Sequence, residues 1–150
     1  MKNLGSFSLV LTFLAAFVNH NSFSQLSINE FMAANSSAVT DPDYGNTADW
    51  VELYNSSAVN VDLSGYFLTD NLSDSTKYQI PAGTIINAGQ FLIFWCDGDS
   101  AGVHTNFSLS SLGEEIGLYG PDQVLVDGLV YTTQETDISY GRSTDGATSW

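Results

Sequence analysis

The sequence predicts an all-β protein that is built as a β-sandwich or a barrel. Eight or nine short segments rich in β-branched and aromatic residues follow one another at spacings of roughly ten residues. Clusters of Gly, Asn, Asp and Pro separate these segments. No part of the chain after residue 24 has the apolar period of a helix, which argues against a fold of alternating strands and long helices.

Nine segments are expected to form strands: 26–33, 49–55, 59–63, 65–70, 76–80, 90–96, 114–120, 123–131 and 138–142. In the second segment, Val51 and Leu53 share one face, which the alternation of a strand directs to the core. Ile116 and Leu118 are expected to point inward in the same way. The segment 90–96 is almost continuously apolar, so we expect it to be the most buried strand.

The N-terminal 24 residues have the features of an export signal. Lys2 precedes an apolar run over residues 9–18, and small residues stand at positions −3 and −1 of a cleavage site before Gln25. The apolar run is shorter than the ~20 residues that span a bilayer. We therefore expect a cleaved signal over 1–24, a mature domain over 25–150 without a transmembrane segment, and secretion or display at the cell surface. The alternative is an uncleaved anchor helix.

The charge balance and the cysteine count limit the partners and the chemistry. Seventeen acidic residues stand against Lys77 and Arg142 in the mature chain. So acidic a domain is poorly suited to nucleic acid, which is bound through cations that replace counterions. The expected partner is a protein or a cell-surface glycan. Cys96 is the only cysteine, so an intrachain disulfide is excluded, and its apolar surroundings predict a buried thiol.

Six segments in order carry a resemblance to a known family: INEFMAAN, DWVELYN, VDLSGYFLTD, YQIPAGTIINAGQFLIFW, HTNFSLSSLGEEIGLYGPDQVLVD and SYGRSTDGATSW. Together they resemble the lamin tail domain in its bacterial exported form, over residues 27–150. The resemblance implies an immunoglobulin-like β-sandwich that acts as a non-catalytic interaction or structural module. The chromatin-docking role of the similar nuclear domains is not expected here, because the signal and the acidic surface do not suit it.

Two other functions are open. Domains of this type accompany nucleases and phosphatases, so the chain is alternatively the accessory domain of a larger secreted hydrolase. The similar domains usually continue past the DGATSW segment into a final strand, so we expect the C-terminal end to be truncated at Trp150. The third function is a calcium-dependent carbohydrate-binding module.

The loop before residue 50 contains the candidate metal ligands. Asp41, Asp43 and Asp49, with Gly45 between them, offer the hard oxygen ligands that Ca²⁺ prefers. Calcium is therefore the cofactor considered. The competing interpretation is a turn in which the Asp side chains accept hydrogen bonds from their own backbone.

Aromatic residues next to this loop are the candidate ligand contacts. Trp50 and Tyr54 share the strand face opposite the core-directed residues, so they are the candidates for stacking on a glycan. Trp95, inside the apolar segment, is expected in the core.

The remaining polar groups do not form a catalytic set. Asp97 and Asp99 are expected in a turn, with at most a weak contribution to calcium binding. His104, the only histidine of the mature chain, is expected to cap or pack a loop, since no positioned nucleophile accompanies it. Glu114 and Glu115 are adjacent on a strand and point to opposite faces, so they do not form an acid/base pair. No catalytic residue is expected.

Overall fold

The computed structural model describes residues 25–150, and the predicted signal over 1–24 lies outside the described residues. This part of the chain is all β and has ten strands: β1 (Leu26–Met32), β2 (Asp49–Asn55), β3 (Val61–Asp62), β4 (Phe67–Thr69), β5 (Tyr78–Gln79), β6 (Ile85–Ile86), β7 (Phe91–Cys96), β8 (Glu115–Tyr119), β9 (Leu125–Val130) and β10 (Tyr140–Gly141). Within residues 25–150, no helix is long and apolar enough to cross a membrane.

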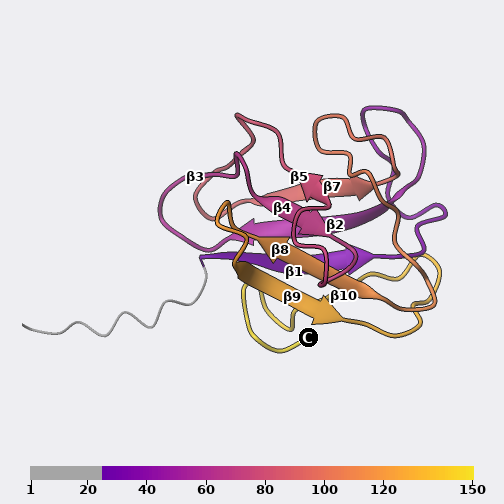
Figure 1. Cartoon of the computed structure of the whole chain (residues 1–150). Coiled ribbons are helices and arrows are strands. Elements are labelled where there is room, and N and C mark those ends of the chain that lie inside the picture. Colours follow the sequence, from indigo (N-terminus) through magenta and orange to yellow (C-terminus); the bar gives the residue numbers. More distant parts are fainter. Residues whose placement is uncertain (1–24) are drawn as a thin grey trace, which may run out of the picture.

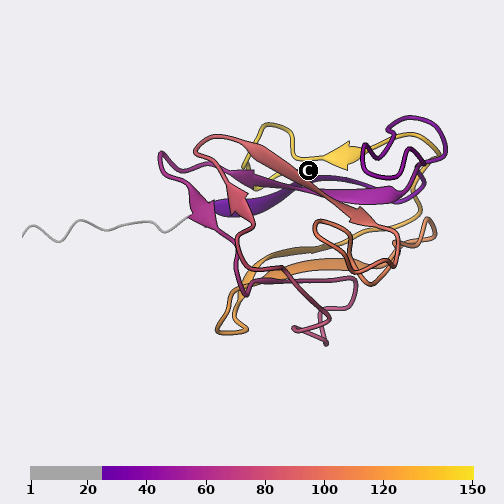
Figure 2. The ribbon, with the colours of Figure 1, turned by 90° about the horizontal axis from the view of Figure 1, so that it is seen from above.

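The strands form two facing layers, which confirms the sandwich (Figure 1). One sheet has the order β10-β1-β2-β7, and the other has the order β5-β4-β8-β9. Seen from above, the sheet that contains β1 and β2 forms the upper layer and the other sheet the lower one (Figure 2). All strand pairs in the two sheets are antiparallel, and a short β3-β6 pair completes the fold.

Each of the nine predicted segments contains a strand, although several strands are shorter than predicted. The sequence did not predict β6, which has only two residues and pairs only with β3. A two-residue strand has no alternation to recognise, so its existence depends on its partner.

The core lies between the two sheets and follows the predicted alternation. Val51 and Leu53 are completely buried in it, as are Ile116 and Leu118 from the opposite sheet. β1 contributes Leu26, Ile28 and Phe31 to this core, and all but one of its residues are buried. Cys96 is a buried free thiol, as predicted.

β7 is not the most buried strand, and that prediction was wrong. Its first residue, Phe91, is 41% exposed, and the next two residues are half-buried. The reason is its place in the sheet, because β7 is an edge strand and β1 is a central one. An apolar sequence favours burial of a strand, but a strand is fully buried only when it has neighbouring strands on both sides.

A second apolar cluster lies on the outer face of the β1–β2–β7 sheet. Its buried members are Met32, Trp50 and Trp95. The loop between β1 and β2 covers it with Val39 and Ala48. Trp95 is thus buried, as predicted, but in this outer cluster and not between the sheets. The cluster gives the β1–β2 loop an apolar surface to pack against.

A buried ion pair joins the two layers near the C-terminal segment. The Arg142 guanidinium contacts the carboxylate of Asp127, on β9, and its Nε donates to the carbonyl of Ile28, on β1, at 2.6 Å. The same Asp127 carboxylate accepts the Ile28 N–H at 2.8 Å. The Trp150 ring lies 4.8 Å from the guanidinium carbon. Arg142 therefore holds an edge of the sandwich where β1 and β9 come together.

Candidate functional site

Two loops meet at one end of the sandwich, the β1–β2 loop and the segment that follows β7 (Figure 1). The pairing of β2 with β7 brings them together, because Asp49 at the start of β2 lies opposite Cys96 at the end of β7. The loop that leads into β2 and the loop that leaves β7 are therefore attached side by side. We call Asp41, Asp43, Asp97 and His104, which meet there, the Asp–His cluster.

Asp41 organises its own loop. Its N–H donates to the carbonyl of Asn46 at 2.9 Å, its carbonyl accepts the N–H of Gly45 at 2.9 Å, and its Oδ1 accepts the N–H of Asp43 at 2.8 Å. Gly45 has a φ of 71°, a left-handed conformation that glycine adopts without strain. The predicted turn with Asp–backbone hydrogen bonds is thus confirmed.

The other carboxylate oxygen of Asp41 has no hydrogen-bond partner. Asp41 is 0% exposed, and its Oδ2 has no hydrogen-bond donor among the described residues. A buried polar atom without a partner costs free energy, and buried polar groups in native proteins are almost always paired. This oxygen is the feature of the site that most needs an explanation.

His104 lies beside Asp41 and is buried, as predicted for a histidine that packs a loop. Its segment folds back along the edge of β7 that faces away from β2, where Trp95 donates to Val103 and accepts from Thr105 at 2.8 and 2.7 Å. The His104 ring thereby comes close to Asp41 and Asp43 of the β1–β2 loop. Its Nδ1 is 2.7 Å from Asp97 Oδ2.

The other distances from the ring are longer. His104 Nε2 is 3.3 Å from Asp43 Oδ2, and Nδ1 is 3.9 Å from Asp41 Oδ2. Burial on its own lowers the pKa of His104, but the hydrogen bonds to Asp97 and Asp43 and the charges of Asp97 and Asp41 outweigh it, so the pKa is raised. The site thus favours a positive charge at this position.

Tyr44 forms the outer wall of the cluster. Its ring packs against the His104 ring at 4.6 Å, and its hydroxyl donates to the carboxylate of Asp99. This hydrogen bond, with a smaller effect of burial, raises the pKa of Tyr44 to about 12. Asp99 N–H donates to Asp97 Oδ1 at 3.0 Å, which confirms the predicted turn.

Asp49, the third predicted metal ligand, is not brought to the other two. Its Oδ1 accepts the N–H of Asn35 at 2.8 Å, and burial raises its pKa. The Asn35 amide in turn donates to the carbonyls of Val39 and Ala48, both at 2.7 Å. Asp49 therefore anchors the base of the loop. Asp41, Asp43 and His104 instead form a candidate ligand group, in which one ligand atom of each residue lies within 4.8 Å of the other two.

The two predicted ligand-contact residues have different environments. Trp50 is 5% exposed within the outer apolar cluster, so its ring presents no face to solvent. Tyr54 is half-buried, and its ring stacks on Phe91 with a centroid distance of 4.6 Å. Gly146 lies so close to the Tyr54 ring that an added Cβ would be 3.3 Å from it. Trp50 therefore offers no open ring face to a sugar, and one face of the Tyr54 ring is covered by Phe91.

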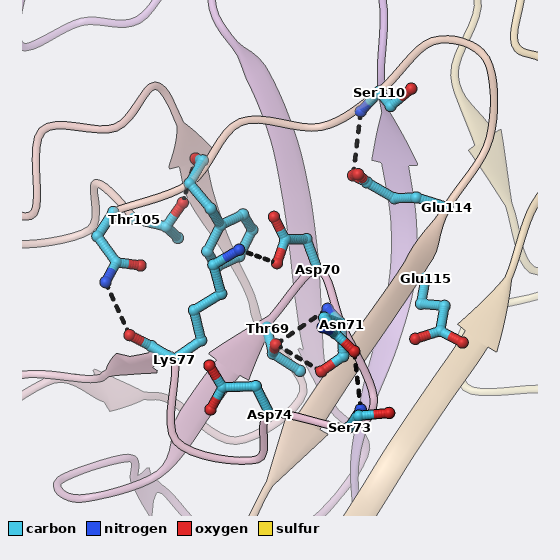
Figure 3. A network of polar contacts seen from close by, with 12 residues as sticks. Thr69, Asp70, Asn71, Ser73, Asp74, Lys77, Thr105, Ser110, Glu114 and Glu115 are labelled. Carbon is cyan, nitrogen blue, oxygen red and sulfur yellow. Dashed lines mark hydrogen bonds and ion pairs between the residues drawn. The ribbon is translucent and has the colours of Figure 1, made fainter.

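A second polar network, on the other sheet, has a structural explanation (Figure 3). Glu114 accepts the Ser110 N–H at 3.1 Å, and Glu115 accepts the Leu72 N–H at 2.7 Å. The two carboxylates thus bond to different segments and point apart, as predicted from their adjacent positions. Lys77 forms an ion pair with Asp70.

His104 and Asp97 are the members of the site whose role the sequence did not reveal. Asp97 was expected in a turn with at most a weak contribution to calcium binding, and His104 was expected to cap or pack a loop. One signal was available, because antiparallel pairing of the predicted strands 49–55 and 90–96 would place residue 97 beside the start of the second strand. No sequence signal predicts that the loop after β7 returns His104 to the start of β2.

Comparison with known proteins identifies the family. The Lamin Tail Domain family matches residues 19–133, which include β1 to β9. No curated protein matches the chain. The match includes five of the six segments described above, all but the one at residues 139–150, and it agrees with the two-layer all-β architecture. The chain therefore belongs to the lamin tail domain family, whose members have an immunoglobulin-like fold.

Proposed function

We propose that the protein is an exported, non-catalytic interaction module that binds an extended segment of a protein partner along the edge of β7 at Phe91 and Ile93. Family membership supports the general role, since the lamin tail domain is an immunoglobulin-like interaction or structural module. The observation that supports the binding mode is an open strand edge beside an apolar hollow.

The backbone hydrogen bonds of β7 support this binding mode. Trp95 makes both of its backbone hydrogen bonds on the side away from β2, so by alternation Ile93 and Phe91 also direct their N–H and C=O groups outward. Among residues 25–150, these two outward-facing positions have no hydrogen-bond partner. Such an edge accepts an additional strand from another chain.

The residues that line the hollow beside this edge favour a peptide ligand with apolar and basic side chains. Apolar groups of Phe91, Ile93 and Trp95 line it, together with parts of the β1–β2 loop. Asp43 and Glu52 also line the hollow, and the domain as a whole is strongly acidic. An extended peptide would gain main-chain hydrogen bonds from β7 and specificity from side chains in the hollow.

Selection from a displayed peptide library on the purified protein tests the proposal. The selected peptides should contain apolar and basic residues, and Ile93→Pro should weaken their binding at least tenfold because it removes an outward N–H. Proline is tolerated on an edge when its missing N–H faces away from the sheet. Phe91→Lys should also weaken binding, through charge repulsion and loss of the apolar contact.

Leu112→Lys is the matched control, because Leu112 is 79% exposed and lies outside the hollow. It should leave the affinity unchanged. Selected peptides that bind the Ile93→Pro and Phe91→Lys variants as tightly as the parent would refute the binding mode. A glycan array in parallel provides a separate check, since binding to glycans alone would favour the carbohydrate-binding alternative.

Export is tested separately. Mass spectrometry of the protein recovered outside the cytoplasm should give a chain that begins at Gln25. The apolar run over residues 9–18 and the small residues before Gln25 support this expectation. A chain retained in the membrane with residues 1–24 still attached would contradict it.

A further inference from the structure

We propose that Asp41, Asp43 and His104 bind a divalent first-row transition-metal ion of the Zn²⁺ class. Two observations lead to this site. One ligand atom from each of the three residues lies within 4.8 Å of the other two. In addition, Asp41 is 0% exposed, and its Oδ2 faces the group without a hydrogen-bond donor.

The histidine cannot satisfy this oxygen. Nδ1 of His104 carries at most one hydrogen, and Asp97 accepts it at 2.7 Å. The 3.9 Å from Nδ1 to Asp41 Oδ2 is too long for a hydrogen bond. Protonation of the ring adds a hydrogen only at Nε2, which faces Asp43. Asp41 Oδ2 therefore lacks a partner in either protonation state, and a bound cation would supply one.

The distance between His104 Nε2 and Asp43 Oδ2 suits a metal better than a hydrogen bond. His104 Nε2 and Asp43 Oδ2 are 3.3 Å apart, whereas charged N–H···O hydrogen bonds measure ~2.7–2.9 Å. Two ligands bound at ~2.0 Å to a tetrahedral ion are ~3.3 Å apart. Asp97 holds the Nδ1 hydrogen and so orients Nε2 towards the ion, the usual arrangement of a carboxylate behind a metal-bound histidine.

Access to solvent is available on one side. The Asp43 side chain is 60% exposed, whereas those of Asp41 and His104 are buried. An ion can thus enter past Asp43, and water can complete its coordination as the fourth ligand. Because Asp43 lies in an exposed part of the loop, its carboxylate can adjust to the ion.

The ligand set favours Zn²⁺ over the Ca²⁺ that the sequence suggested. Calcium requires six to eight oxygen ligands. The site instead offers an imidazole nitrogen with two carboxylates, while the third predicted oxygen donor, Asp49, accepts a hydrogen bond from Asn35 elsewhere in the loop. Imidazole is a ligand typical of Zn²⁺ and its neighbours in the first transition row.

A bound ion would join segments that are far apart in sequence. Asp43 and His104 are 61 residues apart, one in the β1–β2 loop and the other in the segment after β7. The ion would therefore fix this end of the sandwich, and it would do so whether or not the β7 edge binds a peptide. The site is independent of the proposed function in this sense.

Equilibrium dialysis and thermal unfolding of the purified protein, first freed of metal, test the proposal with Zn²⁺ alone as the probe. We expect about one Zn²⁺ per chain, with a rise in Tm of roughly 5 °C or more at a hundredfold excess over Kd. Ca²⁺ at the same excess should have a much smaller effect. Co²⁺ in place of Zn²⁺ should give the visible absorption of a nitrogen-containing, low-coordinate site.

Four variants separate this site from nonspecific binding by carboxylates. Asp41→Asn and His104→Gln should abolish the Zn²⁺-dependent rise in Tm, and Asp97→Asn should weaken binding about 10–100-fold, as expected for a residue that orients a ligand. Glu135→Gln is the matched control, because it removes one acidic charge at an exposed position outside the site. It should bind as the parent does.

Asp43→Asn keeps the test valid if the variants at buried positions fail to fold, because the Asp43 side chain is exposed. It should fold as the parent does in the absence of metal and lose Zn²⁺ binding. The proposal is refuted if Zn²⁺ does not bind, if Asp43→Asn and Glu135→Gln bind it equally, or if Ca²⁺ raises Tm as much as Zn²⁺ does.

Discussion

Replacing Arg142 with Met is expected to destabilise the domain more than any change at its surface. The Arg142 side chain is 7% exposed and makes three kinds of contact. It forms an ion pair with Asp127, donates to the carbonyls of Ile28 and Ala147, and lies over the Trp150 ring. Met preserves much of the apolar stem and removes the charge and every donor.

The expected cost follows from what Arg142→Met leaves behind. Asp127 is only 19% exposed at its side chain and would keep a single close donor from another strand, the N–H of Ile28. Removing one partner of a buried ion pair costs about 3–5 kcal/mol, because the other charge stays buried without compensation. For a domain of this size that corresponds to a fall in Tm of roughly 10–20 °C.

Urea unfolding followed by tryptophan fluorescence measures this cost. Glu135→Gln is the control, since it removes one charge at an exposed position outside this ion pair. The control should cost at most about 0.5 kcal/mol. If the two variants lose equal stability, or if Arg142→Met costs less than about 1 kcal/mol, the buried pair does not hold the sheets together as inferred.

Three further predictions concern the core, one loop and the thiol. Phe31→Ala should lower the free energy of unfolding by about 3–5 kcal/mol, because Phe31 is completely buried, whereas Leu112→Ala at an exposed position should change it by at most about 0.5 kcal/mol in urea titrations. Hydrogen bonds from the Ser37 backbone and hydroxyl and from neighbouring N–H groups lower the pKa of Asp137 in the folded protein. Ionised Asp137 therefore stabilises the fold above the ordinary Asp pKa of ~3.9, and this stabilisation is lost as the pH falls through the lower pKa that Asp137 has in the folded state. Asp137→Asn should therefore make stability less dependent on pH in acid, and an unchanged acid limb in unfolding curves would contradict this. Burial raises the pKa of Cys96, so native protein should resist a thiol reagent that labels it after unfolding, and rapid labelling of the native protein would refute the assignment.

The sequence predicted the local part of the fold well, because strand alternation is a local property. The faces of β2 could be assigned from residues 49–55 alone, since successive side chains alternate. The burial of β7 could not be predicted in this way. Its composition is that of a central strand, and only the order β10-β1-β2-β7 shows that it lies at an edge. The sheet order depends on contacts between distant segments, which no window of sequence contains.

The same distinction explains the candidate site. Asp41 and Asp43 were predicted together because they are neighbours in one turn. Asp49 was added to them because it is also close in sequence, yet the start of β2 directs it to Asn35. The histidine comes from 61 residues further along and meets Asp43 only because β7 pairs with β2. Proximity in sequence therefore grouped Asp49 with Asp41 and Asp43, whereas the structure brings His104 to them.

The ion pairs made by the lysine and the arginine of residues 25–150 affect how the protein associates with other molecules. Lys77 and Arg142 are each held against a carboxylate, so neither offers an isolated positive charge to an approaching partner. Long-range encounter is then governed by a field of one sign. Added salt should slow association with a cationic partner and speed it with an anionic one, and at low ionic strength copies of the protein should repel one another.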